Sequence, residues 1–60
     1  MNREQAVNLI DPTAKLLTWE SPAGVISFWV KGAGWETKLT FSEARAWEIA
    51  LLQVTQEVSK

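Results

Sequence analysis

The chain has 60 residues, a formal net charge of −1, and neither cysteine nor histidine. A chain this short folds as one domain, which we assign to residues 1–60, and the missing Cys and His exclude disulfides and the common zinc and iron sites. The near-neutral charge gives no general attraction to nucleic acid or to an anionic membrane.

The composition is that of a globular protein, since 47% of the residues are hydrophobic and 22% are charged. No apolar run approaches the length needed to span a bilayer, so we expect no membrane contact of that kind. The first four residues, Met1 to Glu4, lack the apolar core of a signal peptide, which predicts a cytoplasmic location. Domains of this size are marginally stable and often gain stability by oligomerisation.

Residues 2–10 predict a short helix. Asn2 can cap it, and Gln5 completes a capping box three residues later. Asp11 and Pro12 end the helix, and we expect a turn over residues 11–14, with a single helical turn as the alternative.

Three strands follow this turn. Residues 16–20 predict the first strand, and residues 21–24, which include a proline and a glycine, predict a turn. Residues 25–31 are dense in β-branched and aromatic side chains and predict the second strand. Residues 32–34 predict a glycine-rich hairpin loop, and residues 35–41 alternate as a half-buried third strand does.

The longest periodic segment predicts a helix that begins at residues 41–43 and ends near residue 58. Its apolar stripe consists of Ala44, Trp47, Leu51, Val54 and Val58. Thr40 and Glu43 match a capping box, and Ser42 is an equally acceptable N-cap. The sequence therefore predicts an α+β fold: a short N-terminal helix, a three-stranded antiparallel β-meander, and a long C-terminal amphipathic helix packed on one sheet face.

Strand alternation divides the sheet into two faces. We expect the helix-covered face to carry Leu17, Trp19, Ile26, Phe28, Val30, Leu39 and Phe41, with Trp35 at its end. We expect the outer face to carry Leu16, Thr18, Glu20, Val25, Ser27, Trp29, Lys31, Glu36, Lys38 and Thr40. A large aromatic such as Trp29 on an open face calls for a cover, which the N-terminal helix, a second protomer or a ligand could supply.

These assignments leave more apolar surface than one copy hides. Trp29, Val25 and Leu16 lie together on the outer face, and Ile49 and Leu52, beside Arg45, form a second apolar edge on the helix. Scattered surface residues are the alternative interpretation of the helix pair. We therefore predict a non-enzymatic protein-interaction module, a regulator, inhibitor or adaptor that acts as a homodimer. These six residues are predicted to bind its partner, which is another protein, a second copy of the chain, or both.

Nothing in the sequence predicts catalysis. Without His or Cys, the serines and threonines have no obvious activating base, and the carboxylates fall on turns and exposed faces. Gly32 and Gly34 lead into a strand, whereas a phosphate loop leads into a helix. We expect no enzyme activity, no cofactor and no metal.

DNA binding is the second hypothesis. In element order, residues 16–54 resemble the arm-type DNA-binding domain of phage integrases and the plant AP2 domain. The resemblance implies that the outer sheet face meets DNA through Trp29, Lys31 and Lys38, with Ser27 and Thr18 as polar contacts. The chain departs from such a site in its Glu20 and Glu36, since phosphate neutralisation needs an excess of basic side chains.

Overall fold

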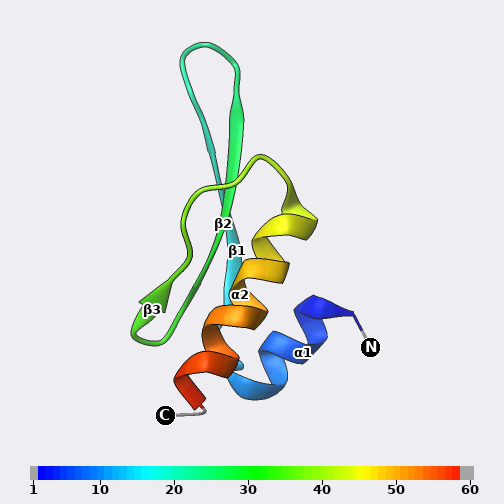
Figure 1. Cartoon of the computed structure of the whole chain (residues 1–60). Coiled ribbons are helices and arrows are strands. Elements are labelled where there is room, and N and C mark those ends of the chain that lie inside the picture. The colour runs from blue at the N-terminus through cyan, green and yellow to red at the C-terminus, as the bar shows by residue number, and fades with distance from the viewer. Residues whose placement is uncertain (1, 59–60) are drawn as a thin grey trace.

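The computed structural model describes residues 2–58, with side chains described for residues 2–56. Its elements are α1 (Arg3–Ile10), β1 (Lys15–Glu20), β2 (Ile26–Gly32), β3 (Trp35–Glu36) and α2 (Glu43–Val58), as Figure 1 shows. The strands form one antiparallel sheet in the order β1-β2-β3. α2 packs on β2 and β1, and α1 packs on α2. The predicted α+β architecture is confirmed, and the N-terminal helix lies against α2 of its own chain.

The start of α1 forms as its sequence predicts. The Asn2 side chain accepts the Gln5 N–H at 2.8 Å, and the Gln5 side chain accepts the Asn2 N–H at 3.1 Å. This capping box satisfies two donors that a helix otherwise leaves open. Val7 then enters the core with no exposed surface.

Asp11 joins the end of α1 to the β2–β3 loop. One carboxylate oxygen accepts from the Thr13 N–H and hydroxyl at 2.9 and 2.6 Å. The other accepts the Ala33 N–H and the Trp35 indole N–H, both at 2.8 Å. The Thr13 hydroxyl and the Ala33 N–H stabilise the charged carboxylate most, and together with the other donors they lower the pKa of Asp11 from 3.8 to about 2.

We expect the Asp11 network to make stability pH-dependent in acid. Because the folded-state pKa is lowered, the network contributes fully above the unfolded pKa of 3.8, and its contribution is lost as pH falls to about 2. Asp11→Asn should be less stable than wild type at pH 7 and should lose less stability between pH 4 and 2. Urea titrations at several pH values measure both effects, and parallel pH profiles for the two chains would contradict this role.

The β1–β2 register overturns one predicted assignment. Leu16 lies opposite Val30 and Leu17 lies opposite Trp29, and directly opposed residues point to the same face. Leu16 therefore lies on the helix-covered face, half-buried and packed against the core, whereas Leu17 and Trp19 lie on the outer face. The prediction for β1 was shifted by one residue, which exchanges its two faces.

The third strand is shorter than predicted. β3 ends at Glu36, and the chain returns to the sheet only at Thr40, which exchanges two backbone hydrogen bonds with Phe28 at 2.7 and 2.8 Å. The Thr37 hydroxyl oxygen accepts a hydrogen bond from the Val30 N–H at 2.9 Å. Two residues, Lys38 and Leu39, thus oppose Trp29 alone, which is a β-bulge.

The bulge overturns the assignment of Leu39 and Phe41. A one-residue offset moves every following side chain to the other face. Thr40 is buried beside Phe28, so its two neighbours turn to the outer face, where Leu39 is 57% and Phe41 78% exposed. Thr40 also forms no capping box: its hydroxyl donates to the carbonyls of Phe28 and Ser42, and Ser42 caps α2 by accepting the Arg45 N–H at 3.3 Å.

The apolar stripe of α2 is rotated from the predicted one. Ala46 and Ala50 have no exposed surface, and Trp47 and Val54 are also buried. Ala44 is exposed, Leu51 is half-buried against the core, and the Val58 side chain lies outside the described residues. α2 packs against both the sheet and α1. Its buried surface is therefore wider than the predicted stripe and is displaced around the helix from it. The core consists of Val7, Ala14, Val30, Trp35, Ala46, Trp47, Ala50 and Val54.

Candidate functional site

Both helices cover the same side of the sheet, and its outer face carries a set of apolar side chains. Leu17 and Trp29 lie opposite each other on β1 and β2, and Trp19 lies opposite Ser27. Leu39 and Phe41 add to this face from the segment after the bulge. Trp19 is 52% exposed, and Leu17 and Trp29 are half-buried. We call this surface the outer apolar face and define it as Leu17, Trp19, Trp29, Leu39 and Phe41.

Trp29 is held in place at the centre of the outer apolar face. Its indole N–H donates to the Glu36 carboxylate at 2.7 Å. The Glu36 carbonyl in turn accepts from the Gln53 amide on α2 at 3.2 Å. A tryptophan whose polar atom is already bonded presents a preorganised apolar ring, and Trp is a preferred anchor residue at protein interfaces.

The distal end of the β1–β2 hairpin extends beyond both helices (Figure 1). Ile26 faces the helix side as predicted, yet it is 47% exposed because the helices do not reach it. Val25 is also exposed and adjoins the turn that closes the hairpin. The hairpin end therefore offers apolar side chains on both of its faces.

The sheet residues predicted to bind a partner divide between the two faces. Trp29 lies on the outer face as predicted, and Val25 is exposed at the hairpin end. Leu16 faces the core and is therefore not available to bind a partner. Leu17, Trp19, Leu39 and Phe41 were missed as surface residues, because a one-residue shift in β1 and the bulge before Thr40 both exchange faces.

The helix residues predicted to bind a partner lie away from the sheet's outer face. Leu52 is 57% exposed, and Ile49 is half-buried. Arg45 is exposed and forms an ion pair with Glu48. Glu48 forms a second ion pair with Arg3 of α1 at 3.4 Å. The structure does not bring these three residues together with the outer apolar face, since α2 covers the opposite side of the sheet.

The basic residues form a separate row at the start of the hairpin. Lys31 lies opposite Lys15 on β1 and opposite Glu36 on β3. All three are exposed on the outer face beside Trp29, as is Lys38 at the bulge. Lys15 had not been included among the predicted nucleic-acid contacts, and the cross-strand register is what places it there.

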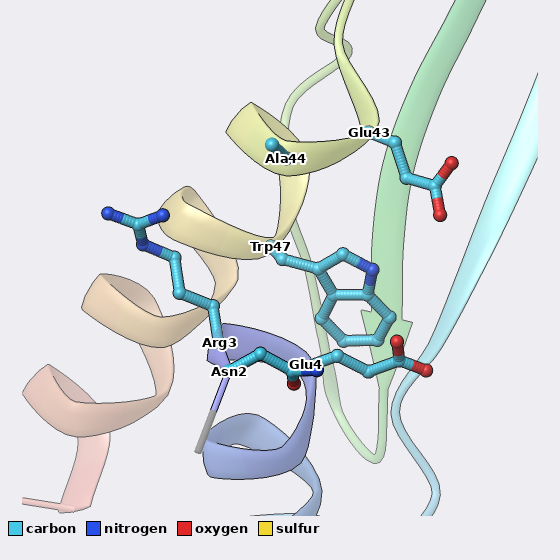
Figure 2. Close-up of a pocket in the computed structure, with 6 residues that line it drawn as sticks. All are labelled: Asn2, Arg3, Glu4, Glu43, Ala44 and Trp47. Atoms are coloured by element: carbon cyan, nitrogen blue, oxygen red, sulfur yellow. The ribbon is translucent and has the colours of Figure 1, made fainter.

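A groove lies between the first turns of α1 and α2 (Figure 2). Its volume is about 390 Å³, and it is lined by Asn2, Arg3, Glu4, Glu43, Ala44 and Trp47. The Trp47 indole is almost fully buried, and Arg3 is engaged with Glu48. Among the side chains that the structure describes, those of residues 2–56, no three acidic, His or Cys groups gather to hold a metal ion. The groove combines no nucleophile with a base, so we assign it no chemistry.

Comparisons with known proteins identify no relative. No protein-family model matches the chain, and no curated protein or solved structure matches it significantly. Among the residues that the structure describes, no helix has the length and apolar character needed to cross a bilayer. The outer apolar face is the largest group of exposed aromatic and aliphatic side chains that the sheet presents.

Proposed function

We propose that this protein is a small, non-enzymatic interaction module that acts as a homodimer, with the outer apolar face as its binding surface. One observation carries the proposal. Both helices lie on one side of a three-stranded sheet, while the other side presents Trp19, Leu39 and Phe41, each more than half exposed. Contiguous apolar patches on a soluble protein mark interaction sites, because their exposure to water is unfavourable.

The composition of the face supports a protein partner. Aromatic side chains are enriched at the buried centre of protein interfaces, and charged residues are depleted there. Leu17, Trp29 and Leu39 follow one another across the sheet, and the charged side chains beside them are Lys38 at the bulge and the neighbouring row of Lys15, Lys31 and Glu36. A homodimer also fits the chain's length, since a domain of about 60 residues is marginally stable alone.

The test is sedimentation equilibrium of the wild type and of a Trp19→Ser/Phe41→Ser double variant. We expect the wild type to self-associate and the double variant to dissociate at least about tenfold more readily, because two aromatic side chains of the outer apolar face are lost. Both side chains are more than half exposed, so the variant should keep its helical circular dichroism.

Leu9→Ser provides the matched control. Leu9 is 71% exposed on α1, away from the sheet, and its replacement should leave association unchanged. If the double variant associates as tightly as the wild type while Leu9→Ser weakens association, the binding surface lies on the helices and the proposal is wrong.

DNA binding through the same face is the second candidate. The observation that favours it is the opposed pair Lys15 and Lys31, which lies beside Trp29 on the outer face. Against it, Glu36 lies opposite Lys31 and bonds Trp29. If DNA is the ligand, binding should weaken steeply with salt and should disappear on Lys31→Glu with Lys38→Glu. Salt-independent binding would exclude this candidate.

A further inference from the structure

The free edge of β1 presents a defined set of unpaired backbone groups. The Ser21 N–H donates to the Val25 carbonyl at 2.9 Å, so these two residues form a hydrogen-bonded pair in the β1–β2 register. Such pairs alternate along an antiparallel ladder. The backbone groups of residues 15, 17 and 19 therefore point toward β2, and those of Leu16, Thr18 and Glu20 point away from the sheet.

The two edges of the sheet differ in how they are protected. On one edge, β3 has only two residues and leads into a bulge, and short or bulged edge strands resist pairing with another chain. On the other edge, β1 has six regular residues without proline, glycine or bulge. In the part of the chain that the structure describes, β1 pairs only with β2. β1 is thus the edge open to an added strand.

A second copy of β1 fits this edge in one best register. Only residues 16, 18 and 20 offer outward groups, so an antiparallel pairing must oppose even-numbered residues to one another. Placing Thr18 opposite Thr18 of the second copy also places Leu16 opposite Glu20, and Glu20 opposite Leu16. This register engages all three outward residues on both strands, whereas a shift of two residues leaves some of them without a partner.

The side chains are compatible with the same register. Leu17 of each copy lies opposite Trp19 of the other on the outer face, and apolar cross-strand pairs of this kind stabilise a sheet. The two Thr18 side chains meet on the helix side, and paired β-branched residues are favourable there. No like charges oppose each other, because Lys15 lies opposite Ser21 and Glu20 lies opposite Leu16.

We infer that two copies of this chain join through their β1 edges, Thr18 to Thr18, into one continuous six-stranded antiparallel sheet. The two-fold axis is perpendicular to the sheet, since opposed residues share a face. All four helices then lie on one side, and the two outer apolar faces merge into one surface on the other. The inference rests on the proposed function in requiring self-association, and it adds how the homodimer is built: of the outer apolar face, Leu17 and Trp19 lie at the contact between the two copies, and the remaining residues stay exposed on the merged surface.

Thr18→Cys tests this register directly, because the chain has no other cysteine. In the inferred dimer the two Thr18 Cα atoms are about 5.5 Å apart, as in any hydrogen-bonded antiparallel pair, and a disulfide spans that distance. We expect mild oxidation to convert the folded variant to a covalent dimer. Lys15→Cys is the matched control. In this register the two cysteines at position 15 lie about 20 Å apart, so this variant should form no disulfide-linked dimer under the same conditions.

Thr18→Pro provides an independent second variant. Its missing N–H points away from β2, so the chain's own sheet loses no hydrogen bond, whereas the dimer loses both bonds between the two Thr18 residues. We expect dissociation to become about tenfold or more easier by sedimentation equilibrium. Thr18→Val keeps the N–H and should dimerise as the wild type does.

The outcomes separate the inference from the proposed function. A wild-type dimer with no Thr18 disulfide and with unchanged association of Thr18→Pro overturns edge pairing and leaves the interaction module standing. Equal disulfide formation at residues 15 and 18 overturns the register. A wild type that stays monomeric at every concentration overturns both the inference and the homodimer.

Discussion

Replacing Trp47 by alanine is expected to unfold much of the protein. Trp47 is 6% exposed and lies in the core with Val7 and Val30. Losing a buried tryptophan costs about 3–5 kcal/mol. A domain of this length has a total stability of roughly 3–9 kcal/mol at typical values per residue, so the substitution removes most of it. Far-UV circular dichroism and urea titration measure the loss.

Trp19→Ala is the matched control for Trp47. The same atoms are removed, but Trp19 is 52% exposed and lies on the outer face. We expect it to change the stability of the monomer by less than about 1 kcal/mol, as exposed substitutions usually do, and to weaken self-association. If Trp19→Ala destabilises the monomer as strongly as Trp47→Ala, then β1 presents the opposite face to the core and the assigned register is wrong.

Gly32→Ala is expected to produce the second large loss of stability. A Cβ at this position would overlap the Asp11 carboxylate and the indole ring of Trp35. Both groups are fixed by their mutual hydrogen bond, and Asp11 also holds the Ala33 N–H. Relieving the overlap must break this network, and overpacking of a closed site costs about 1–3 kcal/mol or more. Thermal unfolding followed by circular dichroism measures the effect.

Gly24→Ala is the control that measures the cost of backbone strain without steric overlap of the added Cβ. Gly24 has a φ of 85° and nothing near its missing Cβ, so its replacement costs only the left-handed penalty of about 1–2 kcal/mol. Gly32 has no positive φ, and its effect is purely steric. We expect Asp11→Ala to relieve part of the Gly32→Ala loss in the double variant. Strictly additive losses would contradict direct overlap between the two residues.

Local sequence signals were sufficient to predict the elements. The Asn2 and Gln5 capping box and the Ser42 cap form as their residue types indicate. The dense run of β-branched and aromatic residues forms the central strand, which pairs on both sides. These signals act over a few residues, so tertiary packing does not overrule them, and the α+β order followed from them.

The predicted register of β1 was wrong because the predicted hairpin loop was one residue too long. The hairpin closes at Ser21 and Val25 around a three-residue loop, Pro22 to Gly24, with Gly24 in the left-handed conformation. A glycine in the last position of such a loop is typical of three-residue hairpins. Counting four loop residues moves the closing pair by one position. That error assigned Leu16 to the surface and Trp19 to the core.

The bulge after β3 has a weaker local signal. Residues 35–41 alternate in sequence as a regular strand does, and only the tertiary structure shows that the Thr37 hydroxyl replaces a backbone acceptor for Val30. The bulge places Thr40 beside Phe28 and exposes Leu39 and Phe41. The predicted surface therefore contained Trp29 and Val25 but not the residues that complete the outer apolar face.

The central claim, an outer apolar face that binds, is tested most directly by the four indole N–H signals in proton–nitrogen NMR spectra. Trp19 lies on the outer face, whereas Trp35 and Trp47 are buried in the core between the sheet and the helices. On dilution from millimolar to micromolar concentration, the Trp19 signal should shift as the dimer dissociates, and the Trp35 and Trp47 signals should stay in place. A Trp19 signal that is unchanged across this range, or shifts confined to the two buried tryptophans, would contradict the claim.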